Sequence, residues 1–369
     1  MKRTPKYVLV AEKLRSDIEK RYGPGDRLPA EPQLCARYNV SMITVRQAVK
    51  ELAGRGIVSR EQGRGTFVLD RRPRNPLKRV AYIYQTTFSS LEQDPVTGEA
   101  FAGVFAACSA QGISTLTLPV GDVTDSSPPD RRLLSPVTYR GLGADGLIIY
   151  AGPFPEEYIR GVAESSSLPV VLLNGNSPSI PSVSVDHRGG TRQALEHLYA
   201  LGHRRIGFLY YHRAGRLSPS FDERYKAYVA FRRKHRLEEL PSLVAGVDAK
   251  RPAGRSEATA LLAAGPTAIM AANDRLAMAV YDAARDLGWS VPRDLSVVGF
   301  DDAPCAVNAC PPLTTVRAPV RELGSEAVAL LRRMADDSGR HKSRRVRTGL
   351  VVRDSTAPAR RKKTARKSL

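Results

Sequence analysis

Residues 1–70 place polar and basic side chains at the start of one helix and at a glycine-rich tip. Thr44 and Arg46 follow Ser41 at the beginning of a helix-forming stretch, and the motif QGRG lies further on. Hydroxyl and guanidinium groups at the start of a helix can bond base edges or phosphates in the major groove of DNA. Glycines let the backbone approach a sugar-phosphate chain, and an arginine between them can enter the minor groove. We therefore predict DNA contacts from Ser41, Thr44, Arg46, Gln62, Gly63, Arg64 and Gly65.

The distribution of charge supports a polyanionic partner. The chain has 369 residues and a net charge of +20. Residues 1–79 hold 19 Lys and Arg against 8 Asp and Glu, and residues 360–369 add six basic residues and no acid. Because general solubility would not require such segregation, we expect double-stranded DNA as the partner. The alternative is a winged helix that binds protein and leaves Arg64 in solvent.

Further along, three strand-like runs end in amides or acids. Asn174 ends PVVLLN, Asn273 and Asp274 follow TAIMAA, and Asp301 and Asp302 follow LSVVGF. Ligands of open α/β sheets bind beyond the carboxyl ends of the strands. Paired donors and acceptors of this kind suit a ligand rich in hydroxyls, such as a sugar. For Asp274 and Asp302 the alternative, which we favour, is that they cap the following helices.

Other polar and aromatic candidates carry less specific signals. Phe88 lies in a long loop and could stack on the apolar face of a sugar. Asp186 is either a helix N-cap or a ligand contact, and we favour the cap. His197 and His203 are six residues apart, a spacing that indicates structural use rather than a metal site. Without a catalytic or phosphate-loop motif in the required context, we expect no catalytic residue, metal or cofactor.

The predicted elements of the first part form a winged helix-turn-helix. Residues 6–21 have the spacing of an amphipathic helix, residues 29–38 suit a second, and Ser41 is a good N-cap for a third. Asn39 can adopt the left-handed turn conformation, and Gly54 suits the end of the third helix. The stretches GIVSRE and GTFVL then alternate as two strands around QGRG.

The rest of the chain alternates strands with helices, which predicts an α/β body with parallel sheets. The expected organisation is a DNA-binding domain at 1–70, a linker at 71–79, a body at 80–357 and a basic disordered tail at 358–369. The nine expected strands are VAYIY, ISTLTL, DGLIIY, PVVLLN, PSVSV, RIGFLY, TAIMAA, LSVVGF and LTTV.

Cysteine usage and apolar runs exclude several classes of protein. The four cysteines form no CxxC pair, which is typical of a reducing compartment. No N-terminal segment has the pattern of a signal peptide, and the longest apolar runs are strand-sized. We therefore expect a cytoplasmic protein that does not engage a membrane.

The motifs of residues 6–69 resemble the DNA-binding domain of GntR-type bacterial transcription regulators. The resemblance rests on LPAE, TVRQA and GRGTFV, which stand in the family's order. Two positions depart from the family, which often has arginine where this chain has Pro32 and Met42. Both positions commonly meet DNA, so the operator sequence does not carry over.

The later motifs resemble LacI/GalR-type regulators. The resemblance covers most of residues 79–357 and rests on VSVDHRGGTRQALEHLYALGHRRIGFL, PTAIMAANDRLAMAVYDAARDLGWSVPRDLSVVGFDD and PPLTTVRAPVRELGSEAVALL. It implies a periplasmic-binding-protein-like body, in which three crossovers join two subdomains around a ligand cleft. The pairing of a GntR-type head with this body is similar to arabinose-repressor-like proteins. Residue by residue, the resemblance assigns Asn174, Arg224, Asn273 and Asp301 to the ligand.

The resemblance also implies a homodimer. Its contacts would come from residues 85–135 and from a helix near 321–334. In that helix Val328, Leu330 and Leu331 form an apolar stripe, and the alternative is that this stripe belongs to the core of the same chain. The expected function is a ligand-responsive repressor of sugar-utilisation genes, released from operator DNA by a small sugar. The alternatives are a fused cofactor-dependent enzyme, a transport binding protein and a regulator that senses a nucleoside-type ligand.

Overall fold

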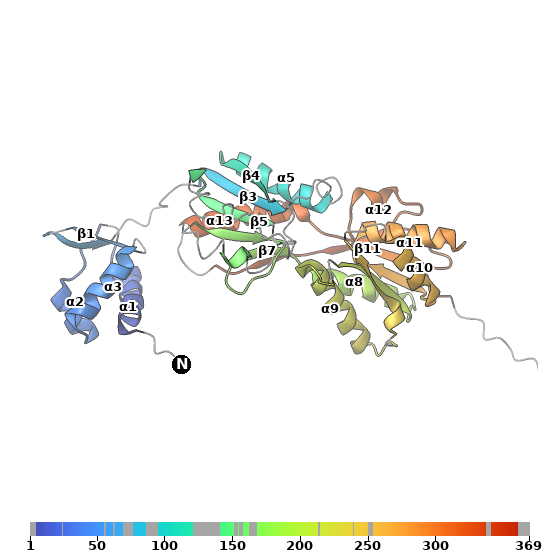
Figure 1. The fold of residues 1–369 in the computed structure, drawn as a ribbon, viewed down its shortest axis with the longest axis horizontal. Coiled ribbons are helices and arrows are strands. Elements are labelled where there is room, and N and C mark those ends of the chain that lie inside the picture. Colours follow the sequence, from blue (N-terminus) through green and yellow to red (C-terminus); the bar gives the residue numbers. More distant parts are fainter. Residues whose placement is uncertain are drawn as a thin grey trace, which may run out of the picture. The chain divides into compact units, whose positions relative to one another are not determined.

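A computed structural model describes most of the chain. The structure shows two compact units, of which the second begins at Leu77 (Figure 1). Two of the predicted site residues, Gln62 and Phe88, lie outside the described residues, as do most of the predicted linker and tail. The described residues are 5–23, 25–54, 57–61, 63–68, 77–85, 95–120, 141–150, 154, 158–161, 168–212, 215–238, 240–249, 254–336 and 341–360.

The first unit, here called the head, is the predicted winged helix-turn-helix. Its elements are α1 (Lys6–Arg21), α2 (Glu31–Tyr38), α3 (Met42–Gly54), β1 (Val58–Glu61) and β2 (Gly65–Val68). The left-handed Asn39, with φ of 51°, ends α2 as predicted. The predicted inner face of α3 is buried, and it packs with α1 and α2 around a small apolar core.

The structure refines two features of the head. The second helix begins at Glu31 rather than at residue 29, because Ala30 occupies the N-cap position and its backbone N–H donates to Gln33 Oε1. Residues before this helix pair with β2, since Leu28 N–H donates to the Thr66 carbonyl. This pairing ties the wing to the start of the helix-turn-helix, a contact that the sequence pattern did not predict.

The body contains two six-stranded sheets, and the first is parallel throughout, in the order β13-β7-β6-β5-β3-β4. Two helices, α5 (Pro95–Ser109) and α13 (Val320–Asp336), lie beside this sheet (Figure 1). The strands are β3 (Arg79–Gln85), β4 (Ser114–Val120), β5 (Gly146–Tyr150), β6 (Val170–Leu173), β7 (Ser182–Val185) and β13 (Arg344–Val346).

The second sheet has the order β14-β12-β11-β10-β8-β9, and only β14 runs antiparallel to its neighbour. Its strands are β8 (Ile206–His212), β9 (Val244–Asp248), β10 (Ala268–Ala271), β11 (Ser296–Asp301), β12 (Thr314–Arg317) and β14 (Gly349–Val351). The helices of this half are α8 (His187–Ala200), α9 (Pro219–Lys234), η2 (Pro241–Leu243), α10 (Arg255–Ala263), α11 (Asp274–Asp286) and α12 (Pro304–Asn308).

The chain passes between the two halves of the body three times. It crosses from β7 to α8, returns from β12 to α13, and crosses again from β13 to β14. The first and third crossovers lie side by side, because Asp186 N–H donates to the Val346 carbonyl. The two-subdomain fold with three crossovers is therefore confirmed.

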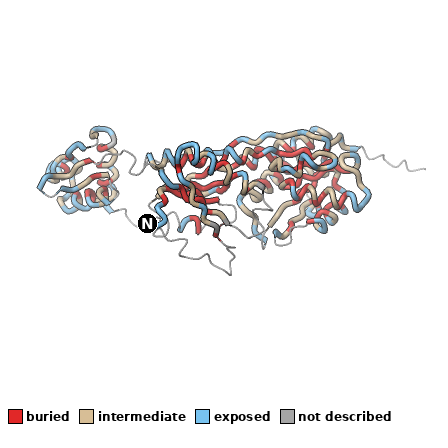
Figure 2. Tube along the Cα trace, turned by 90° about the horizontal axis from the view of Figure 1, so that it is seen from above, coloured by how far each residue is buried: buried red, intermediate tan, exposed pale blue. Residues whose placement is uncertain are grey.

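Several predictions about the body need correction. Of the two interpretations of the apolar stripe of α13, the second holds, because Val328, Leu330 and Leu331 are buried within the chain and form core rather than a dimer surface. Figure 2 shows such buried segments, in red, inside the body. The predicted linker overlaps the body, because Arg79 begins β3. The predicted tail starts too early, because Arg360 pairs with Asp294. Among the described residues, no helix has the length and apolar character needed to cross a membrane.

Candidate functional site

The outer face of α3 is polar and exposed at the end that the sequence assigned to DNA. Ser41 Oγ accepts from the Thr44 backbone N–H over 3.4 Å and lies 3.0 Å from the Thr44 hydroxyl. This bond caps the helix, as predicted, and it orients both hydroxyls together. The inner face buries Val45 and Val49 in the head core. The helix therefore presents its other side, which includes Arg46, to solvent.

Arg46 is held by a carboxylate from the neighbouring helix. Its Nε donates to Glu31 Oε2 over 2.8 Å, and the other oxygen of Glu31 accepts from Arg60 over 2.6 Å. The Glu31 carboxylate raises the pKa of Arg46, so this guanidinium stays charged. One acid thus fixes two arginines at the junction of α2, α3 and β1. Base readout by Arg46 stays a prediction.

The wing has the tight glycine tip that the sequence predicted. Gly63 and Gly65 have φ of 75° and 124°, a region that favours glycine. A side chain at position 65 would also crowd its neighbour, because a Cβ there would lie 2.7 Å from Arg27 Nε. Arg64 keeps a largely exposed side chain, with 77% of it accessible, and bonds only Glu61 among the described residues. Its guanidinium also lies 5.9 Å from the centre of the Phe67 ring, and an ion pair this exposed can be exchanged for another partner.

A buried chain of hydrogen bonds joins the two halves of the body. Asn174, at the end of β6, accepts at Oδ1 from His187 Nε2 over 3.0 Å. Arg224, on α9, donates from Nε to His187 Nδ1 over 3.3 Å and from Nη2 to Asp301 Oδ1 over 3.0 Å. Three of the predicted ligand residues therefore meet, with His187 as the link between them.

Arg224 is more constrained than the sequence indicated. Only 5% of the residue is exposed, its Nη1 donates to the Ala272 carbonyl, and its guanidinium lies 3.6 Å from the centre of the Phe300 ring. Stacking on an aromatic ring and pairing with Asp301 both stabilise a buried charge. Arg224 therefore forms a rigid part of the cleft wall.

His187 is neutral in this environment. Burial and the nearby charges of Arg224 and Arg345 hold the pKa of His187 well below its usual value. Because Arg224 donates to Nδ1, that nitrogen carries no proton, and Nε2–H donates to Asn174. The Asn174 amide in turn donates to the Tyr150 hydroxyl over 3.4 Å. His187 had no clear signal in the sequence, because it follows the helix-capping Asp186 and resembles an ordinary first residue of a helix.

The other polar candidates have structural roles. Asn273 Oδ1 accepts from the Leu276 N–H and so caps α11. Asp186 caps α8 through the Gly189 N–H, which confirms the favoured interpretation. Asp302 binds Arg317 and Arg353, each over 2.7 Å, and is not a helix cap.

Asp274 lies beneath the loop that carries Asp301 and Asp302. Its two oxygens accept from the Thr315 hydroxyl and from the Ala303 N–H. Burial, with a smaller contribution from Asp301, raises the pKa of Asp274 to about 8. Asp274 therefore fastens β12 and the loop after β11 to α11, and the N-cap of that helix is Asn273 rather than Asp274 as we favoured.

Backbone conformation marks the same edge of the sheets. Asn174, Asp301 and Asp302 have φ of 54°, 111° and 62°, which is uncommon for residues other than glycine. Such conformations cluster at ligand sites, where the surrounding structure imposes them. All three residues stand at strand ends, where the sequence predicted the ligand.

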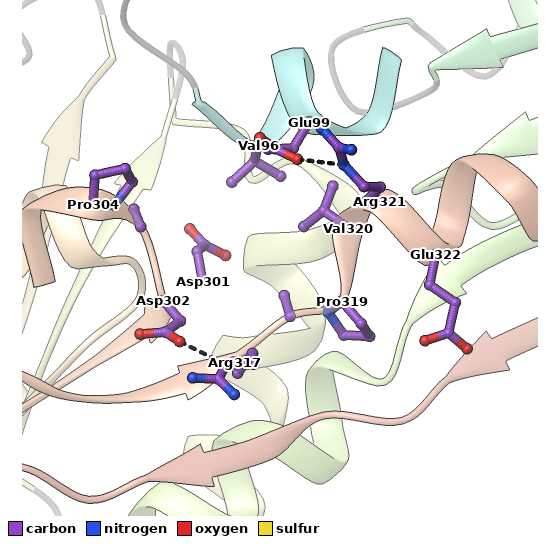
Figure 3. A pocket seen from close by; sticks show the side chains of 12 residues that line it. Val96, Glu99, Asp301, Asp302, Pro304, Arg317, Pro319, Val320, Arg321 and Glu322 are labelled. Atoms are coloured by element: carbon purple, nitrogen blue, oxygen red, sulfur yellow. Dashed lines mark hydrogen bonds and ion pairs between the residues drawn. The ribbon is translucent and has the colours of Figure 1, made fainter. Parts of the chain in front are cut away.

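A cavity of about 630 Å³ lies between the halves of the body. Figure 3 shows Asp301 at this cavity, while Asp302 turns towards Arg317. Of the predicted ligand residues that the structure describes, Asp301 lines the cavity, and Asn174, Arg224 and Asn273 do not. The described lining residues are Val96, Glu99, Asp301, Asp302, Ala303, Pro304, Arg317, Ala318, Pro319, Val320, Arg321 and Glu322.

The two histidines set aside in the sequence bond the C-terminal segment. His197 Nε2 lies 2.9 Å from the Thr356 hydroxyl, and His203 bonds both Thr267 and the Ala357 carbonyl. The structural use that we predicted for them is confirmed.

Comparison with known proteins identifies both units. Residues 6–68 match bacterial regulatory proteins of the gntR family, and residues 195–356 match a periplasmic binding protein-like domain. The chain is 28% identical to the arabinose metabolism transcriptional repressor of Geobacillus stearothermophilus, over 96% of this chain and 98% of that protein. It is 34% identical over 228 residues to an uncharacterized HTH-type transcriptional regulator of Streptomyces limosus, which covers 58% of this chain and 63% of that protein.

The chain spans 57–63% of the length of three such Streptomyces regulators. Among solved structures, the complex of the transcriptional regulator CelR with cellobiose gives a TM-score of 0.66 at 25% identity, over 86% of this chain and 91% of that one. The chain is therefore similar to bacterial gntR-family regulators in its head and to periplasmic binding protein-like domains in its body.

Proposed function

We propose that this chain is a transcription regulator that binds operator DNA through its head and a small effector through its body. One observation carries the proposal: a buried hydrogen-bond chain and a cavity both join the two halves of the body, in a protein with a gntR-family head. A ligand shifts a conformational equilibrium only if it binds one conformation more tightly than the other. A ligand that contacts both halves of the body meets this condition, because it favours the conformation in which the halves are close together. Repression, with release by the effector, fits the repressors that the chain resembles.

The effector that suits the cavity is an uncharged molecule rich in hydroxyls. Among the described lining residues, both arginines are already paired, Arg317 with Asp302 and Arg321 with Glu99. No unpaired cation of this lining therefore remains for a phosphate or a carboxylate. Val96 and Val320 offer apolar surface, and Asp301 offers a hydrogen-bond acceptor. A neutral sugar can use both the apolar surface and the hydrogen-bond acceptor. A nucleoside is the second candidate.

A homodimer completes the proposal, because two heads on a near-palindrome bind more tightly than one. Phe105, on α5 within the predicted dimer region, is 54% exposed, and its ring lies 6.1 Å from that of Phe101. An aromatic side chain exposed in this way is a suitable contact for a second copy. Sedimentation of a monomer at micromolar concentration, with and without DNA, would overturn this part.

The proposal places the protein in the cytoplasm, and it excludes enzymatic activity. A fused cofactor-dependent enzyme would need a different body, and a transport binding protein would not carry a DNA-binding head. The cytoplasmic location follows from the DNA partner.

The test begins with selection of bound duplexes from a random pool by the full chain. Sugars and nucleosides are then screened by thermal shift, since a ligand raises the melting temperature by mass action. Operator titration with the ligand should show affinity reduced by roughly 5- to 150-fold, the usual range of allosteric coupling. A protein that selects no sequence, or an operator affinity that no stabilising ligand changes, would contradict the proposal.

A further inference from the structure

The outer face of α3 carries a short stripe of exposed residues. Ile43, Arg46, Gln47 and Lys50 follow the spacing of one helix face, and all four are exposed. Ile43 is 80% exposed, the highest exposure among the large apolar residues described. A single exposed isoleucine is unremarkable on most surfaces. Here it lies on the helix that enters DNA, within a strongly basic head.

The neighbours of Ile43 and Gln47 are already committed to other bonds. Ser41 and Thr44 bond each other, and Arg46 is held by Glu31. Among the described residues, no group forms a hydrogen bond with the Gln47 amide. The chemistry that this face can still offer is therefore the apolar side chain of Ile43, the amide of Gln47 and the ammonium of Lys50.

These groups match the major-groove edges of A·T pairs. Thymine presents an apolar 5-methyl group, and adenine presents N7 and N6–H, which a glutamine amide can bond together. Residues four apart on a helix lie about 6 Å from each other, which is close to two base-pair steps of about 3.4 Å each. Lys50, one turn further along, suits a phosphate.

We propose, on the basis of the proposed function, that Ile43 contacts a thymine methyl group and Gln47 bonds an adenine in each half-site. Ile43 and Gln47 are then specificity-determining residues that the sequence did not single out. Ser41 and Thr44 position the helix through phosphates or the helix start, and base readout by Arg46 stays a separate prediction. The pair accounts for base readout in a chain that has Met42 and Pro32 where arginine is common in related heads.

The thymine contact is tested by replacing each thymine of a selected operator with deoxyuracil, one at a time. Uracil pairs as thymine does and lacks only the methyl group. Loss of one buried methyl should weaken binding of the parent about fourfold, at one position in each half-site. Ile43→Ala should bind the thymine duplex more weakly and show no response at that position.

Leu9→Ala is the matched control, because Leu9 is a 53% exposed apolar residue on α1 of the same head. This variant should keep the parent's response to deoxyuracil. If no thymine is sensitive in the parent, or if Ile43→Ala keeps the parent's sensitivity, the Ile43 contact is wrong.

The adenine contact is tested with 7-deazaadenine, which replaces N7 by a carbon. The parent should lose roughly 5- to 150-fold at one adenine, the range expected for a bidentate pair. Gln47→Ala should lose that sensitivity and relax the preference at the same position in a repeated selection. Unchanged preference would overturn the Gln47 contact while leaving the proposed function intact. A parent that selects no sequence at all would overturn the proposed function, and this assignment with it.

Discussion

Arg224 donates from Nε to Nδ1 of His187 over 3.3 Å, and through His187 it belongs to a hydrogen-bond chain that connects the two halves of the body. On one side His187 bonds Asn174 of the first sheet, and on the other Arg224 bonds Asp301 of the second. The cleft walls are thus in contact through side chains of the chain itself. An effector must bond to members of this chain or displace them, which gives it a direct route to the angle between the subdomains.

Arg224→Ala should abolish the response to effector. The variant removes three hydrogen bonds and leaves the Asp301 carboxylate buried without its charged partner. Breaking a buried pair in this way costs about 3–5 kcal/mol of stability. The measurement is operator titration with and without the identified ligand, together with thermal unfolding.

Asp301→Asn is the milder companion, because it keeps the shape of the side chain and an acceptor for Arg224. It should bind operator as the parent does and respond to effector only at higher concentration. If Arg224→Ala, in its folded fraction, responds at the parent's effector concentration, the assignment of the cleft is wrong.

The protonation of His187 should make the body sensitive to acid. Its folded pKa is depressed, so between that pKa and about 6.5 the unfolded chain binds a proton that the folded chain does not. Stability is therefore full above about pH 6.5 and falls as the pH drops, by up to about 1.4 kcal/mol per pH unit. Thermal unfolding between pH 7.5 and 5 measures this slope.

His187→Gln separates this effect from that of other groups. The glutamine carbonyl can accept from Arg224 and its amide can donate to Asn174, without a titrating proton. The difference between parent and variant should appear only below about pH 6.5. Parallel curves over the whole range would show that His187 is not the group responsible.

The sequence predicted those parts of the fold in which local pattern and burial agree. Asn39 and Ser41 mark helix ends through their own backbone and side-chain preferences, and the nine predicted strands of the body appear as apolar runs. The strands β9, β13 and β14 were missed, because they are only partly buried and have no comparable apolar run. In α13 an apolar stripe does not reveal whether it faces the same chain or another, and here it is core.

The residues of the candidate ligand site were also predicted only in part. Residues at strand ends could be named because parallel strands bring their carboxyl ends to one edge. His187 could not, because its role depends on Asn174 and Arg224, which approach it only in the folded body. Asn273 caps α11 with its side-chain oxygen, a role that the sequence analysis did not predict, and its contact with a ligand stays a prediction.

The crossing of α5 and α13 depends on two glycines. A Cβ at Gly324 would collide with the backbone of Val104, and a Cβ at Gly103 with the Arg321 carbonyl. Gly324→Ala should therefore destabilise the body by about 1–3 kcal/mol or more through overpacking. Denaturant unfolding measures the change in the free energy of unfolding.

Gly98→Ala is the matched control for this prediction, because Gly98 lies on the same helix α5 and has open space where a Cβ would be. Alanine is the better helix former, so this variant should be neutral or stabilise by up to about 1 kcal/mol. Equal destabilisation by Gly98→Ala and Gly324→Ala would show that close backbone packing is not the reason for the glycine at 324.

Arg64 at the wing tip should act through the minor groove and the backbone rather than through base edges. Its guanidinium is largely exposed and bonds Glu61, which it can exchange for the negative potential of a narrow A·T-rich groove. Arg64→Ala should weaken operator binding more when the flanking sequence is A·T-rich than when it is G·C-rich. It should also reduce the slope of log affinity against log salt by about 1, as expected for one lost phosphate contact. Arg192→Ala, which removes an exposed arginine from α8 of the body, controls for the change in net charge. The prediction fails if Arg64→Ala loses the same operator affinity with A·T-rich and with G·C-rich flanking sequence, or if Arg192→Ala loses as much. Either result would show that the wing arginine does not enter the groove.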